Sequence, residues 1–60
     1  MDDFTKEDLK EAHRAIASLI SKCKKAQEKL PQGTSQHTLL KNRIKALQIA
    51  SILITKELAE

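Results

Sequence analysis

Few residues of this chain are suited to chemistry: Cys23, His13 and His37 stand out. Cys23 lies on an apolar stripe at helical spacing, where a free cysteine behaves as a small buried hydrophobic residue. The two histidines lie near opposite ends of the expected fold, so within one chain they cannot share a metal ion. The sequence also shows no nucleophile–base pair and no phosphate-binding loop. It therefore predicts no enzyme, no cofactor and no metal site.

Basic residues are the other chemical feature, and they gather around the expected turn. Between positions 22 and 45 the chain carries seven lysines and arginines and one acid, Glu28, whereas the other acids lie near the two ends of the chain. Two interpretations stay open. The basic half either faces the acidic end of a second, inverted copy, or it binds nucleic-acid phosphates and releases their counterions. The candidate phosphate contacts are Lys22, Lys25, Lys29, Lys41 and Lys45.

Two helices are expected to position these residues. In the first helix, apolar residues recur at alternating steps of three and four, as on the inner face of a packed helix. Thr5 is suited to cap its beginning. His13, Ile20 and Gln27 flank the apolar stripe on one side. The stripe consists of Leu9, Ala12, Ile16, Leu19, Cys23, Ala26 and Leu30.

A short turn joins the helices. Pro31 disfavours helical backbone at the residue before it, Gly33 suits a turn, and Thr34 or Ser35 can cap the second helix. The prediction is one all-α domain over residues 1–60, with helices at about 6–29 and 35–58 and a turn at 30–34. Helices of equal length joined this tightly form an antiparallel hairpin.

The second helix carries more apolar surface than one neighbour can cover. Its apolar arc spans roughly half of its circumference, which is typical of a helix with several neighbours. A chain of 60 residues has a small core, so oligomerisation is the expected source of those neighbours. The fold prediction is therefore a homodimeric four-helix bundle of two hairpins. Its candidate interface residues are Leu39, Ile44, Ala46, Leu47, Ala50, Leu53 and Ile54.

Three more residues of the second helix have expected roles. Arg43 lies inside the apolar arc, where a single polar residue can set the register of packed helices. Ile49 and Ile52 lie outside the arc and are candidate contacts for another protein. The layout resembles the bacterial RNA-binding hairpin dimers of the Rop type in architecture alone. No motif matches residue by residue, so the resemblance implies no function.

Composition narrows the function classes. The chain is 40% hydrophobic and 32% charged, which suits a folded protein, and its longest nearly uncharged run is too short to cross a membrane. No secretion signal is seen near Met1, so a cytoplasmic location is expected. The sequence predicts a small, basic, homo-oligomeric adaptor or regulator that binds other proteins in an unknown pathway. The alternative is RNA or DNA backbone binding, although no Trp or Tyr is present to stack on bases.

Overall fold

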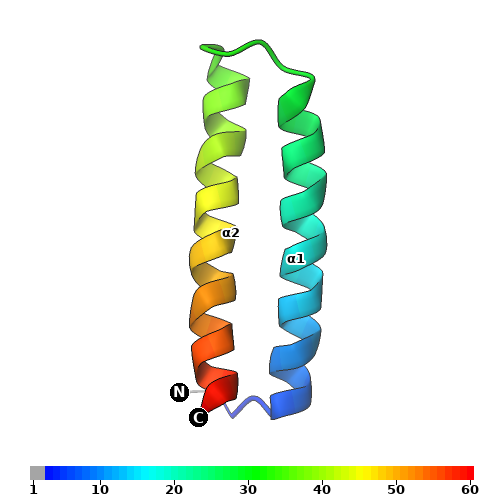
Figure 1. The fold of residues 1–60 in the computed structure, drawn as a ribbon, viewed down its shortest axis with the longest axis vertical. Coiled ribbons are helices and arrows are strands. Elements are labelled where there is room, and N and C mark those ends of the chain that lie inside the picture. The colour runs from blue at the N-terminus through cyan, green and yellow to red at the C-terminus, as the bar shows by residue number, and fades with distance from the viewer. Residues whose placement is uncertain (1–2) are drawn as a thin grey trace.

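The computed structural model describes residues 3–60 as two helices packed side by side in opposite directions (Figure 1). Helix α1 spans Lys6–Glu28 and helix α2 spans Ser35–Ala59. The helical hairpin expected from the sequence is thus confirmed. The molecule measures 41 by 18 by 17 Å between Cα atoms, with the turn at one end and the beginning of α1 beside the end of α2 at the other (Figure 1).

Helix α1 begins where its first backbone N–H groups find side-chain acceptors. Thr5 is extended, and its Oγ1 accepts a hydrogen bond from the N–H of Asp8 at 3.0 Å. The carboxylate of Asp8 accepts one from the N–H of Thr5 at 3.1 Å. This reciprocal capping box also places a negative charge where the helix dipole favours it. Thr5 is therefore confirmed as the N-cap, and Asp8 completes the cap.

The turn is organised by Thr34. Its Oγ1 donates a hydrogen bond to the carbonyl of Pro31 at 2.9 Å and accepts one from the N–H of His37 at 3.2 Å. Thr34, not Ser35, is therefore the N-cap of α2. Gly33 has a φ of 85°, a left-handed conformation that glycine adopts without steric cost. These bonds reverse the chain within a few residues and hold the helices antiparallel.

The helices pack along one stripe of each. Ile44 of α2 is 8% exposed and is the only buried hydrophobic residue among positions 3–60. The other inward residues along the two helices are only half-buried, so two helices alone build a thin core. Those of the first half of the chain are Leu9, Ala12, His13, Ile16, Ile20, Cys23, Gln27 and Leu30. Those of the second half are Thr34, His37, Leu40, Leu47, Ala50, Ser51, Ile54 and Leu58.

The inward side of α1 differs in part from the expected stripe. Ile20 and Gln27 are half-buried, whereas Leu19 and Ala26, which were expected to face inward, are exposed. The expectation was wrong because a stripe of three- and four-residue steps can be drawn through either pair. Neighbouring residues lie only about 100° apart around a helix, and a single partner helix covers one of them. Leu19 is left 47% exposed.

Candidate interaction surfaces

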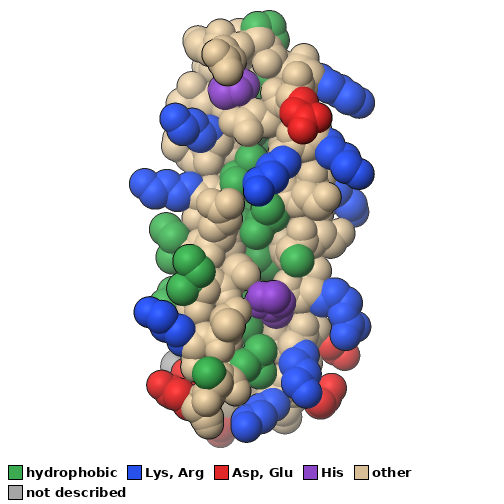
Figure 2. All heavy atoms as spheres, viewed as in Figure 1, with side chains coloured by type: hydrophobic (Ala, Val, Ile, Leu, Met, Phe, Trp, Pro, Cys, Tyr) green, Lys and Arg blue, Asp and Glu red, His purple; other side chains and the backbone are tan. Residues whose placement is uncertain are grey.

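Exposed hydrophobic residues are the main feature of the surface. Leu19 on α1 and Leu39, Ile49, Ile52 and Leu53 on α2 are 47–60% exposed. Figure 2 shows hydrophobic side chains standing out along the edge formed by α2. Single exposed apolar residues are ordinary, but a contiguous group on a small protein marks an interaction surface.

Three of these leucines lie on the same face of the hairpin. Angles around each helix can be measured from its inward stripe at about 100° per residue. Leu19 then lies roughly 65° around α1. Leu39 and Leu53 lie roughly 100–150° around α2 in the same rotational sense. Antiparallel helices are related by an approximate two-fold axis perpendicular to their common plane, so equal rotational senses lead to the same face. We call this surface the apolar face. Its exposed apolar residues are Ala15, Leu19, Ala26, Leu39, Ala46 and Leu53, and by the same measure exposed Lys22 lies on it as well.

The seven residues expected at an oligomer interface lie in two environments. Ile44 is buried and Leu47 and Ile54 are half-buried, because all three are turned toward α1. The hairpin itself therefore already covers this group. The others belong to the apolar face or, for half-buried Ala50, to its border; they are Leu39, Ala46, Ala50 and Leu53.

The other residues singled out on α2 are exposed as well. Arg43 lies at the edge of the apolar face and forms no ion pair within residues 3–60, where the pair Lys10–Glu7 at 3.6 Å is the only one. By the same angular measure, Ile49 points away from α1. Ile52 lies toward the side opposite the apolar face. Both isoleucines are therefore outside the inward stripe and outside the apolar face.

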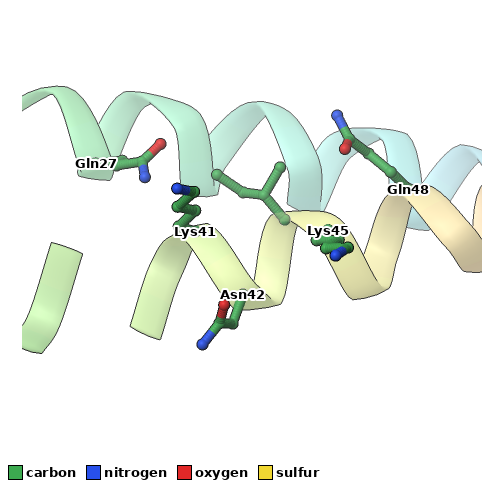
Figure 3. Close-up of a pocket in the computed structure, with 6 residues that line it drawn as sticks. Gln27, Lys41, Asn42, Lys45 and Gln48 are labelled. Carbon is green, nitrogen blue, oxygen red and sulfur yellow. The ribbon is translucent and has the colours of Figure 1, made fainter. Parts of the chain in front are cut away.

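The side opposite the apolar face has a shallow hollow lined by Ile44 and by polar residues of both helices. Its volume is about 500 Å³, and it lies beside Ile44 between the helices (Figure 3). In Figure 3, Gln27 of α1 and Lys41 of α2 lie near each other across the gap between the helices, whereas Asn42 is directed away from α1. Lys45 and Gln48 complete the lining. Ammonium and amide N–H groups at an open hollow are donors suited to an anion.

The candidate phosphate contacts are spread over several sides of the rod. Lys41 and Lys45 line the hollow. Lys24, which is not among the predicted phosphate contacts, lies on the part of α1 that faces the same side of the hairpin as the hollow. Figure 2 shows basic side chains along both helices and acidic ones mainly at the end away from the turn. The candidates that lie elsewhere, on α1 or just after it, are Lys22, Lys25 and Lys29.

One contact between the helices was not expected from the sequence. His13 Nε2 lies 3.1 Å from Ser51 Oγ, in a hydrogen bond that joins α1 to α2. A signal for it was present, since both residues are polar positions within apolar stripes and buried polar groups are usually paired. The antiparallel hairpin brings them to the same height. The hydrogen bond therefore gives both residues a role in packing.

No group of three or more His, Cys, Asp or Glu side chains in the described part of the chain is placed to hold a metal ion. Within positions 3–60, neither helix has the length and apolar character needed to cross a membrane. Family models, curated proteins and solved structures give no match to this chain. The function is therefore inferred from the apolar face, the two outer isoleucines and the hollow.

Proposed function

We propose that this protein is a non-enzymatic helical hairpin that works as a homo-oligomer, a four-helix bundle of two copies, and acts as an adaptor for other proteins. The observation that supports this most is that the hairpin buries little apolar surface and exposes much of it. Among residues 3–60 the core has one buried residue, Ile44, while large hydrophobic residues of both helices are exposed. A chain of 60 residues with so little core has small stability of its own. Association removes the exposed apolar surface from water.

The apolar face can supply the energy for this association. Full burial of one leucine contributes about 1.5–3 kcal/mol. Leu19, Leu39 and Leu53 are already about half covered in the hairpin, and two copies bring six such residues together. Covering their exposed halves contributes on the order of 5–10 kcal/mol. The loss of translational and rotational freedom is of similar size, so we expect a dimer that dissociates on dilution.

The adaptor role rests on Ile49 and Ile52. They are 50% and 56% exposed, and they lie away from the apolar face, so a copy bound there leaves them free. Lys45 and Lys56 lie on the same outer side of α2. An apolar pair flanked by ammonium groups suits a partner helix that has an apolar ridge and acidic neighbours.

Sedimentation equilibrium tests the assembly. At high concentration we expect a mass near twice the 6.7 kDa of one chain, falling toward the monomer value on dilution. The mass change follows from the balance of apolar burial and association entropy given above. A mass of one chain at every concentration would contradict the proposal.

Affinity capture of partner proteins tests the adaptor role. Ile49→Lys with Ile52→Lys removes the apolar pair and is expected to abolish capture while leaving the oligomer mass unchanged. Asn42→Lys with Gln48→Lys is the control, because it adds the same charge at exposed positions of the same helix. If the isoleucine variant keeps every partner that the control keeps, Ile49 and Ile52 are not the contact.

The hollow supports a second candidate function, binding of an RNA or DNA phosphate backbone. Lys41 and Lys45 line it together with the amides of Gln27 and Gln48. A lysine that neutralises a phosphate releases a counterion, so affinity for the backbone falls steeply as salt is raised. The positive charge near the turn is also largely unbalanced, because Glu28 is the only acid between positions 22 and 45.

Titration into short RNA and DNA duplexes at low and moderate salt tests this function. Lys41→Gln with Lys45→Gln is expected to remove most of the binding and to lower its salt dependence. Lys6→Gln with Lys56→Gln changes the net charge equally at the opposite end of the rod. Equal loss in both variants would show attraction by net charge only, and no binding at low salt would exclude the function.

A further inference from the structure

The apolar face has a regular composition along the rod. Its residues recur at intervals of seven, which is close to two helical turns. Leucine and alanine alternate on each helix. On α1 the series is Ala12, Leu19 and Ala26, and on α2 it is Leu39, Ala46 and Leu53. Ala12 is half-buried at the border of the face, and the other five are exposed.

The hydrogen bond between His13 and Ser51 shows which of these residues lie at equal heights. In an antiparallel pair, each step forward along α1 matches one step back along α2. Counted from this bond, three pairs share a height to within one residue: Ala12 with Leu53, Leu19 with Ala46, and Ala26 with Leu39. Each of these three levels therefore holds one leucine and one alanine.

This pattern is the same when it is followed from the turn or from the opposite end. We infer that the apolar face is covered by a second copy of this chain in inverted orientation, related by a two-fold axis at the level of Leu19 and Ala46. The inference rests on the homo-oligomer proposed above and specifies its face, symmetry and orientation.

The inverted copy builds layers of even volume. Helix α1 packs on α1 of the second copy, and α2 packs on α2. The middle layer holds Leu19 and Ala46 from both copies. Each outer layer combines Ala12 and Leu53 of one copy with Ala26 and Leu39 of the other. Two leucines and two alanines thus meet in every layer, and this alternation of large and small side chains lets them interdigitate without voids.

Charge selects the inverted orientation, because the apolar pattern alone fits both orientations. Lys22 and Arg43 lie at equal heights on the turn side of the middle level. On the other side of that level, Ala15 and Ala50 lie within one residue of the matching height. In the inverted arrangement the aliphatic parts of the Lys22 and Arg43 side chains pack on these alanines of the second copy, and their charged groups reach the edge of the interface. Without inversion, Lys22 would face Arg43 of the second copy, and like charges would repel.

Charges at the ends of the rod also favour the inverted orientation, but more weakly. Counted from the two-fold axis, Lys29 comes within one helical turn of Glu11 of the second copy, and the symmetry repeats this pair. Both residues are exposed, so the pair contributes little to affinity. It disfavours the uninverted arrangement, in which the basic turns would lie together.

The dimensions of the face suit one further hairpin. The apolar face runs along a rod that is 41 Å long and 18 by 17 Å across between Cα atoms. A stable interface of standard size buries about 800 Å² on each partner, which is roughly one sixth of the 5011 Å² accessible surface of this chain. A second rod of equal length covers the face from end to end.

Two pairs of lysine substitutions on α2 identify the face. Leu39→Lys with Leu53→Lys is expected to give the mass of a single chain in sedimentation, because it places charges within the layers. Ile49→Lys with Ile52→Lys is the matched control, since these residues are 50–56% exposed on the same helix and lie off the face. A wild-type monomer would overturn both the proposed assembly and this inference. A dimer that survives the leucine changes would overturn the inference alone.

A distance between spin labels decides the orientation. A nitroxide at Gln32→Cys in the turn, in a Cys23→Ser background whose dimer mass is checked first, gives one label per copy. Inversion predicts a label separation near the 41 Å length of the rod in pulsed electron paramagnetic resonance. A separation within the 18 Å width of the rod means that the two turns lie together. That result would overturn the inverted orientation and leave the homo-oligomer standing.

Discussion

Helices α1 and α2 are nearly equal in length but differ in how much of their apolar surface the hairpin covers. Leu19 is the exposed large hydrophobic residue within α1, whereas Leu39, Ile49, Ile52 and Leu53 of α2 are 50–60% exposed. A single neighbouring helix covers nearly all of the large hydrophobic side chains of α1, as for an amphipathic helix. Helix α2 has apolar residues on several sides, so one neighbour leaves most of them in water. The difference indicates that α2 provides most of the surface for further association.

The largest effect is expected at the residue where the two helices meet. Ile44→Ala should lower the free energy of unfolding by about 2–4 kcal/mol, because it opens a cavity at the one residue that is buried in the described part of the chain. A single small core supplies about 3–5 kcal/mol, so this variant is expected to be largely unfolded. Urea denaturation followed by circular dichroism measures the loss. Ile52→Ala on the exposed side should change it by less than about 0.5 kcal/mol, and equal losses would contradict the assigned inward side of α2.

Leu53→Ala sharpens the contrast, because its effect should depend on concentration. In concentrated solution we expect a loss of about 1–2 kcal/mol per chain, since the second copy covers this side chain. In dilute solution the loss should fall to roughly half of this, because the side chain is 60% exposed in the single hairpin. Thermal melts of wild type and variant at several concentrations measure both values. A loss that is the same at all concentrations would count against burial by a second copy.

Ile20→Ala and Leu19→Ala separate the two sides of α1. In dilute solution Ile20→Ala should lower the free energy of unfolding by about 1–2 kcal/mol, because Ile20 is half-buried against α2. Leu19→Ala should cost clearly less there, and its cost should rise with concentration. Denaturant midpoints of the two variants at matched concentrations test the assignment. A larger loss for Leu19→Ala in dilute solution would reverse it.

The smallest effect is expected at the beginning of α1. Thr5→Ala removes the acceptor at 3.0 Å from the N–H of Asp8 and should lower the free energy of unfolding by about 1 kcal/mol. Thr5→Ser keeps a hydroxyl and should restore most of the loss. Thermal melts of the two variants compare these values. An equal loss in Thr5→Ser would assign the effect to the methyl group and not to the cap.

The antiparallel hairpin could be predicted because its causes are local. Thr5 and Thr34 cap the helices through residues three positions away. Pro31 restricts the backbone of the residue before it, and Gly33 allows the left-handed conformation that the turn needs. The alternating spacing of apolar residues then requires that the helices pack on each other. Each of these features acts over a few residues, so each can be recognised without the folded chain.

The side of α1 that faces inward was decided only by tertiary packing. A choice between Leu19 and Ile20 changes the rotation of the whole helix, and both satisfy the same spacing. The same rotation brings His13 to 3.1 Å from Ser51, which lies on the other helix. It also leaves Leu19 beside Ala46 on the apolar face.

The sequence by itself therefore determined two helices, their ends and their antiparallel pairing, together with an excess of apolar surface. The tertiary structure decided which leucines α1 and α2 cover for each other and which they leave in water. The physical reason is that caps and turns act within a few residues of the chain. Rotation about a helix axis is set instead by the combined packing of many side chains that are distant in sequence.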